Sequence, residues 1–113
     1  MMEAMLLSRP VIATRFSGNL DFMNDGNSLL IDFAPVILPK EIPPYPAGSR
    51  WAEPSIKQAA ERMRWVYEHR VEAAALGHKA QAELTALLSP KAAGARMAER
   101  LAIIRDDRRR ALS

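Results

Sequence analysis

The feature that most constrains the fold is a segment near the N-terminus, Glu3–Phe22, with the sequence EAMLLSRPVIATRFSGNLDF. Apolar residues at helical spacing up to Leu7 predict the end of a helix. Pro10 cannot continue that helix and favours extended backbone at the residue before it. Val11–Ala13 is then a short apolar run that begins with a β-branched residue, which is typical of a strand buried on both faces of a parallel sheet. The segment therefore predicts an α/β fold.

The residues that follow this strand, Thr14–Gly18, form a predicted loop at its carboxyl end. In open α/β sheets, ligands bind at that edge. Gly18 would let a ligand approach the backbone closely, although a plain turn explains a glycine there equally well. Asn19 is a predicted N-cap for a short helix over Leu20–Asn24. Ser17 and Gly18 are therefore candidate binding residues.

A second apolar run, Leu29–Ile31, predicts another strand within residues 28–32. Two parallel strands joined by a short helix make one βα unit, and we interpret residues 1–32 as a Rossmann-like remnant of this kind. A sheet of two strands is not stable by itself. We therefore expect the sheet to continue in residues outside this chain or to pair with another molecule, and we expect the chain to self-associate through exposed strand edges and apolar patches.

The run EAMLLSRPVIAT followed by SGNLDF resembles the donor-site region of retaining glycosyltransferases with the GT-B fold, and it is most similar to the bacterial family-4-type (group 1) sugar transferases. That family carries two glutamates seven residues apart, and Glu3 matches the second. The first glutamate and its Gly-rich loop would lie before Met1. One departure is Ser8, where the family usually has glycine; a left-handed backbone there would cost about 1 kcal/mol with serine. The resemblance continues, more weakly, through Trp51–Pro54 and Ser89–Pro90.

By this resemblance, the chain is a fragment of a GT-B donor lobe from an enzyme that transfers a sugar from a nucleotide-sugar donor to a carbohydrate or lipid-linked acceptor. Glu3 would bind the donor ribose, since a carboxylate accepts hydrogen bonds from two vicinal hydroxyls; the alternative is a solvated helix glutamate. The resemblance implies no metal and no cofactor. Because such transfer needs an N-terminal lobe or a partner chain, we assign no catalytic residue and expect no activity from the chain alone. The alternative function is a non-catalytic helical interaction module, or a gene remnant, that pairs with a partner chain.

The segment of residues 33–54 contains six of the eight prolines, and we expect it to be largely irregular. Val36–Leu38 could form a short strand, which its flanking prolines would confine to a sheet edge. Two interpretations stay open: a plain surface loop, or a loop that folds over the donor or acceptor cleft. In the second, Tyr45, Arg50 and Trp51 would contact the ligand. A buried Trp51 that anchors the loop is the expectation from residue type.

The segment of residues 55–105 has the pattern of three helices. Ser55 and Gln58 predict a capping box for the first, and Ser89 with Pro90 predict the N-cap and first residue of the third. The predicted apolar faces are Ile56, Ala59, Ala60, Met63, Val66 and Tyr67; then Ala73, Leu76, Ala80, Leu84 and Leu87; then Ala93, Met97, Leu101 and Ile104. The basic tail, residues 106–113, is expected to be solvated, with fraying from Arg105.

Composition excludes several function classes. The 113 residues suit one small, partial domain, and 49% hydrophobic residues can build a core. The absence of cysteine excludes disulfides and is compatible with a reducing cytoplasm, where we expect the protein. No apolar run approaches the ~20 residues of a transmembrane helix. A net charge of +3 is too small to predict nucleic-acid binding, and neither His69 nor His78 has acidic neighbours at metal-ligand spacing.

Overall fold

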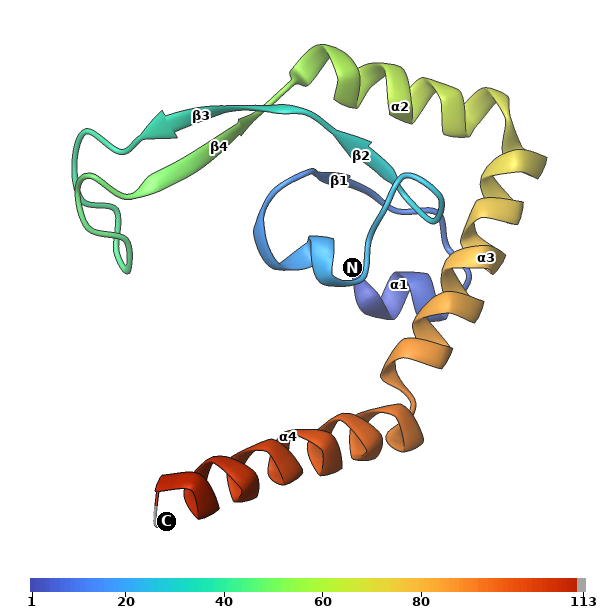
Figure 1. Cartoon of the computed structure of the whole chain (residues 1–113). Coiled ribbons are helices and arrows are strands. Elements are labelled where there is room, and N and C mark those ends of the chain that lie inside the picture. The colour runs from blue at the N-terminus through green and yellow to red at the C-terminus, as the bar shows by residue number, and fades with distance from the viewer. Residues whose placement is uncertain (112–113) are drawn as a thin grey trace.

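The computed structural model describes residues 1–111, which form a mixed α/β chain that is mostly helical (Figure 1). Its elements, in order, are α1 (Met2–Leu6), β1 (Ile12–Thr14), the 3₁₀ helix η1 (Ser17–Asp21), β2 (Leu29–Ile31), β3 (Phe33–Ile37), β4 (Arg50–Pro54), α2 (Ile56–Glu68), α3 (Arg70–Leu88) and α4 (Pro90–Ala111). No helix within these residues has the length and apolar character needed to cross a bilayer.

The first sheet is a parallel pair, β1 and β2, as the two apolar runs predict. Ile12 lies opposite Leu29 and Thr14 lies opposite Ile31. Every residue of β2 is buried, whereas β1 is only partly covered. The parallel βα unit expected from the sequence is therefore present, with β1 shifted by one residue from the predicted run.

The second sheet is an antiparallel hairpin, β3–β4, so the prediction of a largely irregular segment over residues 33–54 is wrong at its two ends and holds for residues 38–49, which form no strand. The possible edge strand at Val36–Leu38 is confirmed for Val36 and Ile37. Phe33 pairs with Pro54, and Ile37 pairs with Arg50. Proline has no N–H group and is tolerated only where a strand has an unpaired edge. Both strands of a two-stranded hairpin have such an edge, and Pro35 sits within β3 for this reason. Only Asp32 separates β2 from β3, and the hairpin extends from the carboxyl end of β2 away from α3 (Figure 1).

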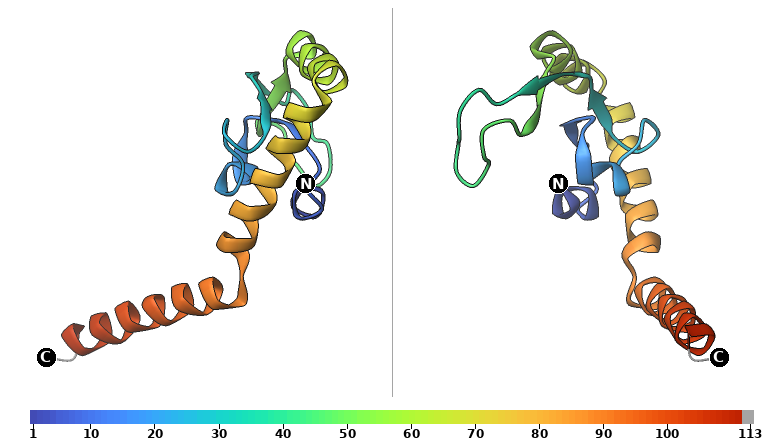
Figure 2. Two further views of the ribbon diagram at one scale, coloured as in Figure 1. Left: turned by 90° about the vertical axis from the view of Figure 1, so that its right-hand side faces the viewer. Right: turned by 60° about the vertical axis from the view of Figure 1, so that its left-hand side comes forward.

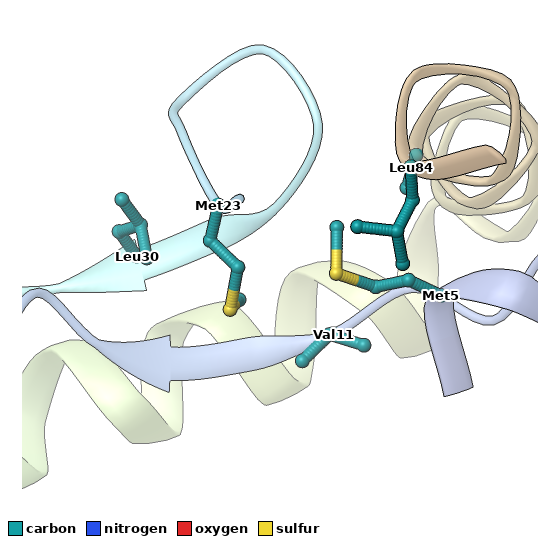
Figure 3. Close-up of a cluster of buried hydrophobic side chains, with 6 residues drawn as sticks. Met5, Val11, Met23, Leu30 and Leu84 are labelled. Atoms are coloured by element: carbon teal, nitrogen blue, oxygen red, sulfur yellow. The ribbon is translucent and has the colours of Figure 1, made fainter. Parts of the chain in front are cut away.

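The hydrophobic core lies between the parallel pair, α1 and α3 (Figure 3). Its buried members are Met5, Val11, Met23, Leu30, Ala80 and Leu84. The predicted apolar face of α3 is largely confirmed, because Ala73, Ala80 and Leu84 are buried. Gly77 is buried on the same face, where α3 crosses the end of α1. The absence of a side chain at Gly77 lets the two backbones meet at Ser8.

The start of α2 is tied to the end of β2. The amide of Gln58 donates to Ser55 Oγ at 3.3 Å, which confirms Ser55 as the N-cap. The reciprocal half of the predicted capping box is wrong, because the Gln58 side chain bonds to Asp32 instead. The Ser55 amide also donates to the Asp32 carbonyl. These contacts fix the start of α2, which directly follows β4, at the end of β2.

Two helices expose the apolar faces predicted for them. On α2, Ile56, Met63 and Tyr67 are exposed, whereas Ala59 and Val66 of the same face are half-buried. On α4, Met97 is 67% exposed and Leu101 is 53% exposed. Helix α4 projects away from both sheets as an arm (Figures 1 and 2), with no element of the described chain covering this stripe.

The predicted fraying from Arg105 is also wrong, because α4 continues through the basic segment to Ala111. Ser89 caps this helix as predicted, accepting a hydrogen bond from the Ala92 amide at 3.1 Å. The last residues of the predicted tail, 112 and 113, lie outside the described part of the chain.

Candidate functional site

The candidate site is built around the loop that follows β1. Ser17 takes a left-handed backbone conformation with φ of 67°, which costs a non-glycine residue about 1–2 kcal/mol. Gly18 is not in that region, and a Cβ built there would meet no atom within 4 Å. The turn therefore places its strain at Ser17, and Gly18 leaves open space beside the backbone.

Asn19 anchors this loop to the strand. Its side chain is buried, and its Nδ2 donates to the carbonyl of Thr14 at 2.9 Å. The same amide lies 3.7 Å from the sulfur of Met23. The prediction that Asn19 caps a helix over 20–24 is wrong, because Asn19 lies inside η1 and its amide satisfies a carbonyl at the end of β1. A buried, bonded asparagine makes the loop a fixed structure.

Two of the three candidate binding residues meet in one cavity. Glu3, from α1, and Gly18, from the loop, both line a cavity of about 350 Å³. Asn19 also lines it, and it lines a second cavity of about 340 Å³ that reaches Thr14 at the end of β1. The parallel strands and α1 thus bring together residues that are far apart along the chain.

The carboxylate of Glu3 is open to solvent, with 88% of its side chain exposed. Hydrogen bonding to its own backbone amide lowers the pKa of Glu3, and the ammonium group of Met1, 3.4 Å away, lowers it further. Glu3 is therefore ionised at neutral pH and can accept hydrogen bonds from hydroxyl groups.

Ser17, the third candidate, faces a different cavity. It lines a volume of about 440 Å³ together with Phe16, Tyr45, Arg50 and Trp51. The hairpin thus brings the three residues predicted to contact a ligand beside the loop after β1. The expectation that Trp51 is a buried anchor is wrong, because 38% of it is exposed and it packs edge-on against Tyr45 at 4.9 Å between ring centroids.

An arginine that sequence reasoning did not single out lies at the start of the loop after β1. The guanidinium group of Arg15 donates to both carboxylate oxygens of Asp25, and Nη1 lies 3.0 Å from Oδ2. Its Nε lies 3.6 Å from Oδ1 of Asp32. The hydrogen bond from Arg15 lowers the pKa of Asp25. Arg15 is the first residue after β1, so its position at the carboxyl end of a predicted strand was a usable signal. Its role here is to join the ends of β1 and β2.

Phe16 is the other residue that sequence reasoning missed. Its ring packs edge-on against Phe33 at 5.1 Å between centroids. Phe16 and Trp51 both line the 340 Å³ and the 440 Å³ cavities, so the two aromatic side chains separate them. Only the hairpin register brings Trp51 opposite this loop.

Within residues 1–111, no group of three or more histidine, aspartate or glutamate side chains is arranged to hold a metal ion. The chain also has no close relative among the proteins with which it was compared: no protein-family model, no curated protein and no solved structure matches it.

Proposed function

We propose that this chain is part of the donor lobe of a retaining sugar transferase and contributes to binding a nucleotide-sugar donor. The observation that supports this most is the meeting of Glu3 and Gly18 in one cavity beside the end of a parallel strand. Ligands of open parallel sheets bind at that edge, and both residues are among the binding residues that the sequence predicts.

In the proposed role, the ionised Glu3 accepts hydrogen bonds from the two hydroxyls of the donor ribose. The open space beside Gly18 admits the ligand to the backbone of the loop, and the buried Asn19 keeps that loop in place. Transfer also requires an acceptor site and cationic groups that stabilise the departing diphosphate. The resemblance places these outside the present residues, so we expect no sugar transfer from residues 1–113 alone.

The test is a calorimetric titration of uridine diphosphate, other nucleoside diphosphates and their sugar conjugates into the wild-type protein and the Glu3→Gln variant. Glutamine keeps the size of the side chain and removes its charge. A hydrogen bond to a charged group contributes about 1.5–3 kcal/mol, so the affinity should fall about ten- to a hundredfold. The loss should be equal for nucleotide and nucleotide sugar, because the contact is to ribose.

Glu68→Gln is the matched control, since Glu68 is exposed at the end of α2 and away from the cavity. The titrations should be done both on this chain and on any longer form of the protein that includes a preceding lobe. Equal nucleotide affinities of the wild type and Glu3→Gln in the longer form would refute the proposed donor contact. Glu3 would then be a solvated helix residue.

The second candidate function, a non-catalytic interaction module, is favoured by the exposed apolar stripe on α4. Met97, Leu101 and Ile104 follow helical spacing along this arm and are uncovered. Exposed apolar patches of this kind mark protein contacts. Binding of a partner protein by the longer form, with no nucleotide affinity, would favour this function over sugar transfer.

A further inference from the structure

The 440 Å³ cavity between the hairpin and the loop after β1 has a composition unlike that of the Glu3 cavity. Three half-exposed aromatic rings line it, from Phe16, Tyr45 and Trp51. They come from two segments that the fold brings together, and they make up three of the chain's seven aromatic residues. A concave surface rich in aromatic side chains with few polar groups is typical of small-molecule sites.

Aromatic rings of this kind suit a sugar ring. The C–H faces of a pyranose are weakly apolar and carry partial positive charge, and the face of an aromatic ring is negative. Trp51 and Tyr45 pack edge-on against each other at 68°, and both stay partly exposed. This arrangement favours a flat, partly apolar ligand.

Arg50 supplies the charge of the cavity. Among the described residues, no carboxylate lies within ion-pair distance of its guanidinium group, and none lines the cavity. Arg15, in contrast, is already bound to Asp25 and Asp32. A guanidinium group presents a planar pair of donors that matches a carboxylate or a phosphate. The positive charge of Arg50 therefore favours an anionic ligand in this cavity.

We propose that this cavity binds a sugar that carries an anionic group, a carboxylate or a phosphate. The sugar ring packs against Trp51 and Tyr45, and the anionic group binds Arg50. The 340 Å³ cavity connects this site to the Glu3 cavity, since it shares Phe16 and Trp51 with the first and Asn19 with the second. The ligand chemistry proposed here rests on the cavity alone and does not depend on the proposed sugar-transfer function.

The experiment uses the fluorescence of Trp51. The chain has two tryptophans, and the Trp65→Phe variant leaves Trp51 as the only one. Methyl glucuronide, glucose 6-phosphate and neutral methyl glucoside are each titrated at constant ionic strength. We expect the anionic sugars to change the Trp51 emission and to bind at least tenfold more tightly than methyl glucoside. Whichever anionic probe binds more tightly identifies the carboxylate or the phosphate as the preferred group.

Arg50→Gln in the same background should lower the affinity for the anionic sugars about tenfold and leave that for methyl glucoside unchanged. Arg64→Gln, which removes an exposed arginine of α2, is the matched control and should change neither. Far-UV circular dichroism checks that each variant is folded.

Two results would overturn the proposal. One is equal binding of charged and neutral sugars, or an anionic-sugar affinity that does not depend on Arg50. The other is an Arg50-dependent change of Trp51 emission by uridine diphosphate that competes with methyl glucuronide, which would make this cavity a nucleotide site. Neither result depends on the Glu3→Gln titration, so failure of this anionic-sugar site and failure of the proposed donor contact are distinguishable.

Discussion

Replacing Gly77 with alanine tests the packing of α3 against the turn after α1. A Cβ at this position would overlap the carbonyl oxygen of Ser8 and lie 2.8 Å from the Ser8 carbonyl carbon and 3.2 Å from that of Arg9. These are backbone atoms that cannot rotate away. The Gln81 side chain also holds this turn in place. It accepts a hydrogen bond from Ser8 Oγ at 2.8 Å and donates one to the Leu6 carbonyl at 2.7 Å.

The magnitude follows from two opposing terms. Alanine is favoured over glycine in a helix by about 1 kcal/mol, whereas overpacking of a fitted contact costs about 1–3 kcal/mol. Gly94 in α4 offers the matched control, because a Cβ there would meet no atom within 4 Å. Gly94→Ala should therefore leave the free energy of unfolding unchanged or raise it by up to about 1 kcal/mol. Gly77→Ala should lie about 1–3 kcal/mol below that control.

Urea denaturation followed by circular dichroism measures both variants, and hydrogen exchange locates the effect. The amides of Ser8 and Arg9 bond to carbonyls of α1, so in Gly77→Ala they should exchange about fivefold faster or more, the factor expected for a loss of about 1 kcal/mol. If Gly77→Ala stabilises the protein as much as Gly94→Ala does, then α3 does not pack on the turn after α1 and the core described above is incorrect.

Three further predictions concern capping, pH and association. Ser55→Ala should lower the free energy of unfolding by about 1 kcal/mol in urea titrations, because α2 loses its N-cap; Ser55→Asn should restore it, and equal losses for both variants would contradict the capping role. The lowered pKa of Asp25 means that its pairing with Arg15 contributes stability above the ordinary carboxyl pKa of about 3.9, and that this contribution is lost as the pH falls through the lowered value. Asp25→Asn should remove that part of the acid dependence in pH-dependent melts, and an unchanged profile would refute the assignment. Sedimentation should show self-association at tens of micromolar, which the double change of Met97 and Leu101 to glutamate should reduce; a compact wild-type monomer would count against it.

The local pattern of the sequence was enough to predict the elements whose stability comes from nearby residues. Pro10, the apolar runs around Ile12 and Leu30 and the cap at Ser55 act within a few positions of the chain, so their effects can be predicted from spacing and residue type. The parallel pairing of β1 with β2 and the buried face of α3 followed from the same patterns. The complete hairpin was not predicted, because prolines disfavour strands in general. Only the pairing of β3 with β4 gives Pro35 and Pro54 a strand edge without a hydrogen-bonding partner.

The tertiary structure alone decided which residues meet. Sequence reasoning named Glu3, Ser17 and Gly18, but spacing cannot show that Glu3 and Gly18 share a cavity while Ser17 faces Trp51 in another. It also predicted apolar faces on α2 and α4 without showing that Met63 and Tyr67 of α2, and Met97 and Leu101 of α4, stay exposed. Helical periodicity reports which side of a helix is apolar, whereas burial depends on whether another part of the fold reaches that side, and contacts between distant segments are set by packing in three dimensions.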